Sequence, residues 1–460
     1  MSDDDLLVAD LVAELPRWLP TQRWFAGKDR AITAVRPLAT TTLLSGDPHL
    51  LHVIVEVEQD DRREPYQLLV GSRQAQVPDV PASASIGLER GLTCYEASGD
   101  AELTSHLLDL IAAGEDVGPL AFRREPGAEL ATGLRSRPIT AEQSNTSLVY
   151  GSQYILKLFR KLAPGTNKDV LLHRALREVG CPHIAEPLGS ITGELDGEPV
   201  TIGMLQQFFP DAVDGWTMAS TSVRDLMADP ELPPGELGGD FAGEAQRLGH
   251  TVAAVHADLA RALGTQPAGP DAFERTVDAM VERLTVVVAR VPALAPYAPS
   301  LRESFESIRT SSAAVSMQYV HGDLHLGQAL RTAAGWLLLD FEGEPAATAE
   351  ERAALRSPLR DVAGMLRSFD YAAQQLLIGH DDAPRLTERA LEWAGRNREA
   401  FCDGYAEASV DEVGDPRDHA TLLRAFELDK AVYEVAYEHA NRPDWLTVPL
   451  SSIARITEGG

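Results

Sequence analysis

The sequence contains few cysteines, few cations and no long hydrophobic run, and each shortage argues against a class of protein. Cys94, Cys181 and Cys402 are odd in number and far apart, which argues against a disulfide framework or a zinc cluster. Lysine and arginine number 41 against 69 aspartates and glutamates, so the basic surface of a nucleic-acid-binding protein is missing. Residues 284–291 come nearest to a membrane span but fall far short of ~18 apolar residues.

These shortages predict a soluble cytoplasmic protein that binds neither nucleic acid nor membrane. The acidic start, Met-Ser-Asp-Asp-Asp, is the reverse of the basic start of a signal peptide, so we expect no export. A chain of 460 residues exceeds one compact domain, and about 150 residues per domain predicts two or three. No feature of the sequence encodes the oligomeric state, and we expect a monomer or a weak dimer.

Hydrophobic patterning predicts an α+β fold with a β-rich first half and a helical second half. In the first half we expect helices at 6–15 and 169–179, strands at 49–58, 66–71 and 199–209, and a β-hairpin from 148–150 and 154–158. A domain boundary is expected between residues 85 and 105. In the second half we expect helices at 241–263, 270–291, 298–313, 359–378, 384–409 and 419–440, interrupted by one strand pair at 317–320 and 335–340. This is a two-lobed layout.

The densest polar cluster is residues 320–328, Val-His-Gly-Asp-Leu-His-Leu-Gly-Gln. Asp340 follows the next strand pattern, in Leu-Leu-Leu-Asp-Phe-Glu-Gly. Phosphoryl transfer uses one carboxylate to take the proton of the acceptor hydroxyl, and a second carboxylate and an amide to hold Mg²⁺. Asp323, Gln328 and Asp340 have the spacing of these groups in protein kinases, with Gln328 in place of asparagine. We therefore predict that Asp323 is the catalytic base and that Gln328 and Asp340 bind the metal.

His321, Asp323 and His325 also have a spacing that zinc hydrolases use for metal ligands. The rest of the sequence adds no further histidine cluster to that alternative. We favour structural roles for His321 and His325, in which their rings bond backbone groups of the loop.

Candidate nucleotide contacts lie upstream. The segment before the predicted hairpin could bind phosphates through backbone N–H groups and hydroxyls; it consists of Gln143, Ser144, Asn145, Thr146 and Ser147. An ordinary turn explains this segment equally well. Lys157 lies inside an apolar strand, where an unpaired cation is costly and phosphate oxygens are a natural partner. Arg160 and Lys161 follow it as an expected solvated strand end. Gln206 and Phe208 end a strand where a hinge would hold adenine, unless the segment is a plain linker.

With these residues in place, the chain resembles the maltokinase-like sugar kinases of the aminoglycoside-phosphotransferase superfamily. The likeness runs almost end to end, through residues 22–28, 142–147, 214–216, 320–328, 339–345, 360–365 and 427–434. The resemblance implies a bilobal, protein-kinase-like fold with a cap in residues 1–95, a nucleotide-binding N-lobe in 96–207 and a helical C-lobe in 208–460. It also implies ATP and Mg²⁺ as cofactors.

Within the family, maltokinases make maltose 1-phosphate, and a related branch phosphorylates glucosamine at the 6-hydroxyl. In the usual maltokinase pattern, Asn-Pro-Asp-x-Glu-Leu, the glutamate is expected to pair with the strand lysine, which is Lys157 here. In this sequence Leu171 stands at the position of that glutamate. Asp169, His173 or Glu178 are possible substitutes. Residues 437–443 depart from the maltokinase pattern as well. These departures favour the glucosamine branch over maltose as the small-molecule partner.

The sugar pocket is expected in the helical lobe, facing Asp323. Carboxylates grip sugar hydroxyls and aromatic rings pack on sugar faces, and an acidic pocket would suit the ammonium of glucosamine. The candidates are Asp323, His325, Asp403, Tyr405, Glu407, Glu434, Glu438 and Trp445, with Glu427, Asp429 and Tyr433 in the wider set. For any single carboxylate among them, an exposed acidic helix face is an equally good explanation.

We therefore expect an ATP- and Mg²⁺-dependent kinase that phosphorylates glucosamine to glucosamine 6-phosphate. A maltokinase is the alternative within this class. A non-catalytic pseudokinase sensor is the alternative outside it, since the lysine lacks its usual glutamate partner.

Overall fold

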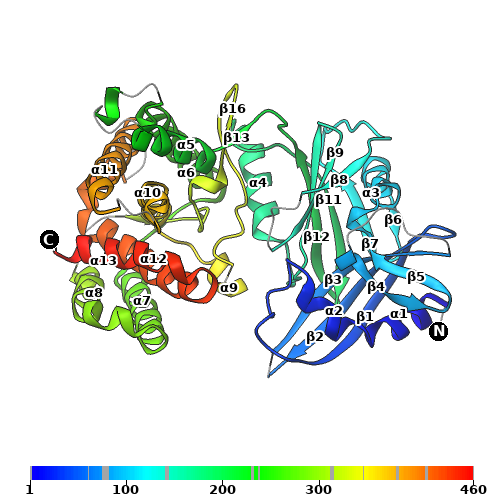
Figure 1. Ribbon diagram of the computed structural model, residues 1–460. Coiled ribbons are helices and arrows are strands. Elements are labelled where there is room, and N and C mark those ends of the chain that lie inside the picture. Colours follow the sequence, from blue (N-terminus) through cyan, green and yellow to red (C-terminus); the bar gives the residue numbers. More distant parts are fainter. Residues whose placement is uncertain are drawn as a thin grey trace. The chain divides into compact units, whose positions relative to one another are not determined.

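The computed structural model describes residues 3–60, 62–74, 82–139, 144–228, 233–236, 239–310, 315–345, 347–379, 383–409 and 413–458. The chain forms two compact units (Figure 1). The first unit comprises Met1–Leu171 and Ala185–Pro210, and the second comprises Leu172–Ile184 and Asp211–Gly460. The change from strands to helices falls near residue 211, as the sequence predicts.

The first unit contains a five-stranded antiparallel sheet in the order β1-β2-β3-β5-β4. Its strands are β1 (Ile32–Leu44), β2 (His49–Gln59), β3 (Arg62–Arg73), β4 (Ser85–Glu89) and β5 (Leu92–Glu96). Helices α1 (Asp3–Val12) and α2 (Leu15–Trp18) accompany this sheet, and Trp18, Trp24, Phe25 and Tyr66 lie in a shared apolar core. The expected strands 49–58 and 66–71 are found, but β1 escapes the prediction because bulges and Pro37 break its alternation.

The second sheet of the first unit has seven strands in the order β6-β7-β11-β12-β10-β9-β8. Its strands are β6 (Asp116–Val117), β7 (Leu120–Arg124), β8 (Ser136–Pro138), β9 (Thr146–Tyr150), β10 (Tyr154–Leu158), β11 (Pro187–Leu195) and β12 (Glu198–Gln207). Helix α3 (Ala101–Ala113) contacts β7 and β8, and α4 (Lys168–Glu178) follows β10. The expected hairpin is β9–β10, in which Lys157 pairs with Ser147.

The two sheets of the first unit are joined where β3 meets the chain beyond β10. The N–H of Gln67 donates to the carbonyl of Arg160 at 2.9 Å, and the N–H of Leu162 donates to that of Pro65 at 2.9 Å. The expected solvated strand end is therefore wrong for Arg160, which is only 1% exposed and bonds Glu96 at 2.6 Å. Burial follows because the neighbouring sheet covers this strand end. Lys161 is exposed and pairs with Glu64.

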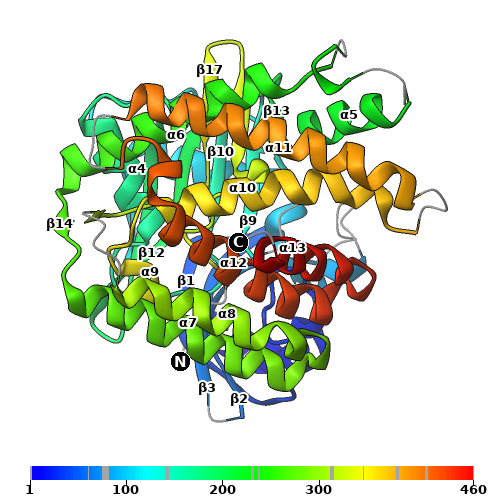
Figure 2. The same cartoon turned by 90° about the vertical axis from the view of Figure 1, so that its left-hand side faces the viewer.

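The second unit is mainly helical, and α10 runs between α11 and α12 (Figure 2). Phe369 of α10 packs on Trp393 and Phe401 of α11. The longer helices are α5 (Gly215–Ala228), α6 (Ala242–Leu263), α7 (Pro270–Arg290), α8 (Ala298–Glu306), α10 (Leu359–Gln374), α11 (Ala383–Ala408), α12 (Ala420–Asn441) and α13 (Thr447–Glu458), with the short α9 at Ala349–Ala353. Five of them, α6, α7, α10, α11 and α12, follow the predicted helices closely, and α8 begins as predicted but ends at Glu306.

The expected pairing of 317–320 with 335–340 is wrong. β15 (Ser316–Met317) pairs with β14 (Gln266–Pro267), and β17 (Gly335–Leu338) pairs with β16 (Ala329–Thr332), which continues to β13 (Val213–Asp214). The chain turns back at Gly335, whose φ of +144° favours glycine, and the four-residue β16 is too short for a periodic signal.

Within the described ranges, none of the helices combines the length and apolarity needed to cross a bilayer.

Candidate active site

The loop with Asp323 is held by one face of α10. Asp361 accepts hydrogen bonds from the N–H groups of His321 at 2.7 Å and Gly322 at 2.8 Å. One turn on, a Cβ at Gly364 would lie 2.5 Å from the carbonyl oxygen of Leu324, so only glycine permits this approach. Ser368 then accepts from the N–H of Leu326 at 2.9 Å. The spacing of Asp361, Gly364 and Ser368 places all three on the same side of the helix.

Asp361 is buried, and burial alone would raise the pKa of its carboxyl group. The hydrogen bond and charge of His256, 3.1 Å away, outweigh burial and lower this pKa. The other ring nitrogen of His256 bonds the hydroxyl of Tyr405 at 2.9 Å. Tyr405, which the sequence predicts to bind sugar, is therefore linked to the Asp323 loop by a chain of hydrogen bonds through His256 and Asp361.

His321 has a structural role in this loop. Its Nδ1 accepts from the N–H of Asp323 at 3.3 Å, so its Nε2 carries the proton and donates to the carbonyl of Leu339 at 2.7 Å. Burial lowers the pKa of His321 and keeps the ring neutral. His325 Nδ1 accepts from the N–H of Gly327 at 3.0 Å. Both rings bond backbone groups, and this arrangement does not favour the zinc-hydrolase alternative.

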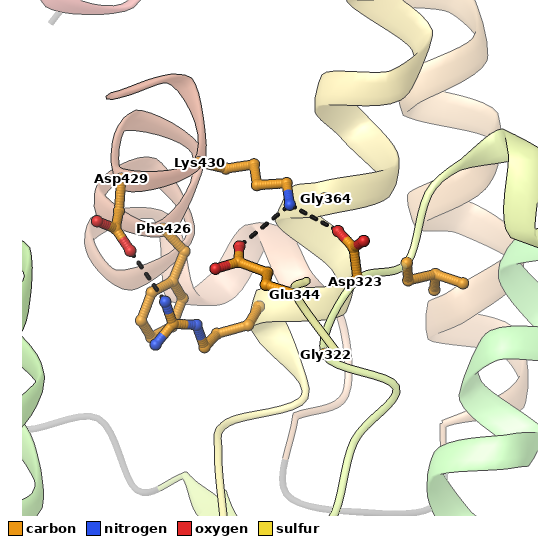
Figure 3. Close-up of a pocket in the computed structure, with 9 residues that line it drawn as sticks. Gly322, Asp323, Glu344, Gly364, Phe426, Asp429 and Lys430 are labelled. Atoms are coloured by element: carbon orange, nitrogen blue, oxygen red, sulfur yellow. Dashed lines mark hydrogen bonds and ion pairs between the residues drawn. The ribbon is translucent and has the colours of Figure 1, made fainter. Parts of the chain in front are cut away.

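Asp323 faces a cation that sequence reasoning missed. Lys430 of α12 reaches between two carboxylates, with its Nζ 2.8 Å from Asp323 Oδ1 and 3.1 Å from Glu344 Oε1 (Figure 3). Burial alone would raise the pKa of Asp323, but the charge of Lys430 outweighs it and the pKa falls to about 2. Asp323 is therefore ionised at neutral pH, as a catalytic base must be.

A pocket opens beside Asp323 (Figure 3), and its charges are already paired. Arg360 Nη2 lies 2.9 Å from Asp429 Oδ2, and Arg283 Nε lies 3.2 Å from Asp429 Oδ1. The ring of Phe426 supplies an apolar wall and carries the guanidinium of Arg360. The pocket is therefore less acidic in balance than the sequence predicts, because each carboxylate named here has a cationic partner.

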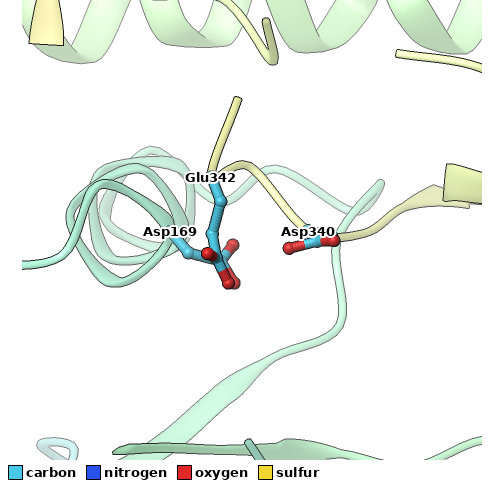
Figure 4. A group of neighbouring side chains, drawn as sticks. All are labelled: Asp169, Asp340 and Glu342. Atoms are coloured by element: carbon cyan, nitrogen blue, oxygen red, sulfur yellow. The ribbon is translucent and has the colours of Figure 1, made fainter. Parts of the chain in front are cut away.

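Gln328 and Asp340, which the sequence predicts to bind a metal together, lie within hydrogen-bond distance of each other. Gln328 Nε2 donates to Asp340 Oδ2 at 3.1 Å. Asp340 has a φ of +64°, an unusual conformation for a residue other than glycine, and such conformations gather at functional sites. Glu342 follows on the same turn, and its carboxylate oxygen lies within 4.8 Å of that of Asp340 (Figure 4). Carboxylate and amide oxygens are the hard donors that Mg²⁺ prefers, so these residues fit that ion.

Lys157 of β10 has a carboxylate partner. Its Nζ lies 2.9 Å from Asp169 Oδ2, and the side chains are 8% and 1% exposed. Asp169 lies in the first turn of α4 (Figure 4). The lysine pairing is therefore kept without a glutamate at Leu171, which removes the argument for a pseudokinase.

The segment before β10 holds most of the predicted phosphate-binding residues. Gln143 lies outside the described residues. Asn145 bonds the hydroxyl of Ser144, and Thr146 Oγ1 accepts from Arg160 Nε at 2.7 Å. Thr146 and Ser147 are the first residues of β9, beside Lys157.

A second pocket lies at the predicted hinge. It is lined by Ser152, Gln153, Tyr154, Glu186, Leu188, Gln207 and Phe208. The N–H of Phe208 donates to the carbonyl of Gln153 at 2.8 Å, which fixes Phe208 against the β9–β10 turn. Gln206 is buried on β12, and its Nε2 has no hydrogen-bond partner among the described residues.

Several predicted sugar contacts lie elsewhere on the helices. Asp403 pairs with Arg417 at 2.7 Å, and Glu407 accepts from Gln246 at 3.0 Å. These carboxylates and Tyr405 belong to α11, and they are absent from the described lining of the Asp323 pocket. Their contact with sugar stays a prediction.

Three further candidates are held by arginines or by stacking. Glu434 accepts from the buried Arg367 at 2.7 Å, and Glu438 accepts from Arg442 at 2.6 Å. Burial raises the pKa of Glu434 despite Arg367. Trp445 stacks on Tyr371 with ring centroids 6.4 Å apart. They too are absent from the described lining of that pocket.

Sequence reasoning missed five residues here, Glu344, Arg360, Asp361, Phe426 and Lys430. Glu344, Arg360, Asp361 and Lys430 lie inside segments recognised as family motifs, so motif membership was an available signal. Their partners could not be identified, because each ion pair joins segments far apart in sequence.

A carboxylate beside a pocket, a neighbouring carboxylate–amide pair and a paired strand lysine are the groups that phosphotransferases of the protein-kinase type use. Solved structures share the fold. A glucosamine kinase (crystal form B) is 23% identical, with a TM-score of 0.73 and full coverage of both chains. A glucosamine kinase in complex with glucosamine, ADP and inorganic phosphate is 23% identical, with a TM-score of 0.69 and 99% coverage of both chains. The predicted fold class is confirmed.

Sequence comparison defines the family. The family model of the maltokinase N-terminal cap domain matches residues 18–100. The glucosamine kinase of Streptacidiphilus jiangxiensis is 30% identical over 364 residues, which are 76% of this chain and 80% of that protein. The glucosamine kinase of Mycolicibacterium smegmatis (strain ATCC 700084 / mc(2)155) is 28% identical, over 72% of this chain and 81% of that protein. The chain therefore belongs to the glucosamine kinase family, and the resemblance inferred from its motifs is confirmed.

Proposed function

We propose that this protein transfers the γ-phosphoryl group of ATP to glucosamine, giving glucosamine 6-phosphate and ADP. The observation that carries the proposal is the 30% identity to a glucosamine kinase over 80% of that protein's length. The ionised carboxylate of Asp323 beside a pocket is consistent with it. A protein of this activity needs a small-molecule sugar partner and ATP.

In the proposed reaction, Asp323 accepts the proton of the acceptor hydroxyl. The acceptor oxygen then bonds the γ-phosphorus, and the bond from that phosphorus to the bridging oxygen breaks, which releases ADP. Lys157 holds nucleotide phosphates, together with Gln143, Ser144, Asn145, Thr146 and Ser147. Gln206 and Phe208 belong to the adenine hinge.

Gln328 and Asp340 would hold Mg²⁺. The hydrogen bond from Gln328 Nε2 to Asp340 Oδ2 at 3.1 Å holds the two side chains next to each other, and the amide oxygen of Gln328 and the carboxylate of Asp340 are hard donors. Bound Mg²⁺ would neutralise charge on the phosphates.

The proposed organisation assigns residues 1–95 to a cap, 96–207 to the nucleotide-binding lobe and 208–460 to the catalytic lobe. We also propose a cytoplasmic location for a monomer or weak dimer. Three buried free cysteines support a reducing compartment.

A sugar panel tests the acceptor. ADP release would be measured with ATP and Mg²⁺ on glucosamine, maltose, glucose and N-acetylglucosamine, with mass spectrometry of the product. We expect turnover on glucosamine to exceed that on maltose at least tenfold. Preference for maltose would support the maltokinase alternative, which the match to a maltokinase cap favours. No turnover on any sugar would reject a sugar kinase.

Asp323→Asn tests the base. Loss of general-base catalysis lowers kcat by about 10²–10⁴-fold, while ATP binding stays near that of the wild type. Calorimetry with a non-hydrolysable ATP analogue provides the control. Full activity in this variant would contradict the assignment.

A further inference from the structure

Lys430 is a nearly buried cation for which the proposed reaction has no role so far. It projects from α12 into the pocket, where its Nζ bridges Asp323 and Glu344 (Figure 3). Burial alone would lower the pKa of Lys430, but the charges of Asp323 and Glu344 outweigh it and raise this pKa, so the ammonium stays protonated. The ring of Tyr433, one turn along α12, lies 4.6 Å from the same ammonium.

The geometry restricts both the charge and the direction of Asp323. Its Oδ1 takes the ion pair with Lys430 at 2.8 Å. Glu344 holds Lys430 from the other side, and Arg283 lies 3.5 Å from the second oxygen of Glu344. A chain of alternating charges therefore runs from Arg283 to the catalytic carboxylate, and a buried charge is tolerable only in such a paired arrangement.

We propose that Lys430 is a positioning residue for Asp323, which it keeps ionised and in a fixed orientation, while Glu344 anchors the lysine. This inference rests on the proposed function, because it assigns Asp323 the role of base. The phosphoryl transfer itself is unchanged: the acceptor proton still passes to Asp323, and ADP still leaves.

The charged groups around Asp323 determine what a pH profile would report. Lys430 and Tyr433 approach from α12, and Glu344 from the loop after β17. His321 and His325 lie on the same loop as Asp323, and burial lowers the pKa of each ring below its usual range. Of these groups, Lys430 makes the largest contribution to lowering the pKa of Asp323.

The test compares Lys430→Met with Lys430→Arg in the full chain. Loss of an opposite charge at hydrogen-bond distance raises the pKa of a carboxyl group by about 1–3 units. A base works only when it is deprotonated, so its contribution is lost as pH falls through its pKa. For Lys430→Met we expect the acid limb of the kcat profile to move upward by that amount. We also expect kcat at neutral pH to fall roughly 100-fold, as for a misplaced base.

Lys430→Arg keeps the charge and should hold the acid limb near its wild-type position. The KM for ATP should stay unchanged in both variants. Lys28→Met removes an exposed lysine of the first unit and serves as the matched control. If Lys430→Met does not fold, the double variant Lys430→Met/Glu344→Gln is measured instead of it. This variant removes one of the two carboxylates that lose their cationic partner.

The outcomes separate the two proposals. Wild-type protein without sugar turnover rejects the proposed function before any variant is measured. Active wild-type protein whose Lys430→Met variant keeps its kcat rejects the positioning role. A Lys430→Met variant that loses kcat without a shift of the acid limb would show a structural role only and would also overturn the inference.

Discussion

At the scale of single residues, the site depends on charges that are buried in pairs. In two ion pairs the lysine Nζ lies less than 3 Å from a carboxylate oxygen, and both pairs are largely shielded from water. These pairs are Lys157 with Asp169 and Lys430 with Asp323. Removing one partner of such a pair leaves an uncompensated charge, which costs more than the pair itself contributes. Each ion pair therefore keeps its lysine and its carboxylate in place.

Asp169→Asn tests the first pair. The amide cannot balance the buried ammonium of Lys157, so we expect the KM for ATP to rise at least tenfold and the free energy of unfolding to fall by about 3–5 kcal/mol. Steady-state kinetics and urea denaturation measure the two effects. Glu178→Gln removes an exposed carboxylate from the same helix and should change neither. Equal effects of the two substitutions would show that the pair is unimportant.

At the scale of elements, α10 supports the loop that carries Asp323. Asp361, Gly364 and Ser368 lie on one side of it, and each approaches a different part of the loop. The helix is buried along most of its length between α11 and α12, so its position is determined by packing on two sides. A change in its contact with the loop is therefore expected to move the loop.

A pair of glycine substitutions tests this contact. Gly364→Ala places a methyl group 2.5 Å from the carbonyl oxygen of Leu324. The loop must shift, and we expect kcat to fall roughly 10–100-fold. Gly395→Ala on α11 meets no atom within 4 Å and should stabilise the protein by about 0.5–1 kcal/mol with activity unchanged. The prediction fails if Gly364→Ala retains wild-type kcat.

At the scale of the whole molecule, the five-stranded sheet belongs to the same compact unit as the strand that carries Lys157. Arg160 is the main polar connection. It bonds Glu96 and Thr146, and its guanidinium lies 4.8 Å from the ring of Trp24. Gln67 adds hydrogen bonds to the carbonyls of Phe159 and Ile202. The two sheets are therefore expected to unfold together.

Adjacent substitutions separate this connection from a surface effect. Arg160→Met leaves Glu96 buried without its cation, and we expect a loss of about 3–5 kcal/mol in the free energy of unfolding. Lys161→Met removes an exposed pair with Glu64 and should cost no more than about 1 kcal/mol. Chemical denaturation of both variants is the measurement. Arg160→Met/Glu96→Gln should recover part of the loss, and its failure to do so would contradict the charge argument.

The sequence by itself determined the fold class, most of the helices, the β9–β10 hairpin and the family. It did so because periodicity and short motifs are local: Asp323, Gln328 and Asp340 stand at a spacing that phosphoryl transfer requires, whatever surrounds them. Tertiary structure decided the partners. Lys430 and Asp323 are more than a hundred residues apart, and Arg160 is buried only because a second sheet covers it. Which charge faces which depends on how helices and sheets pack, and no local pattern records that.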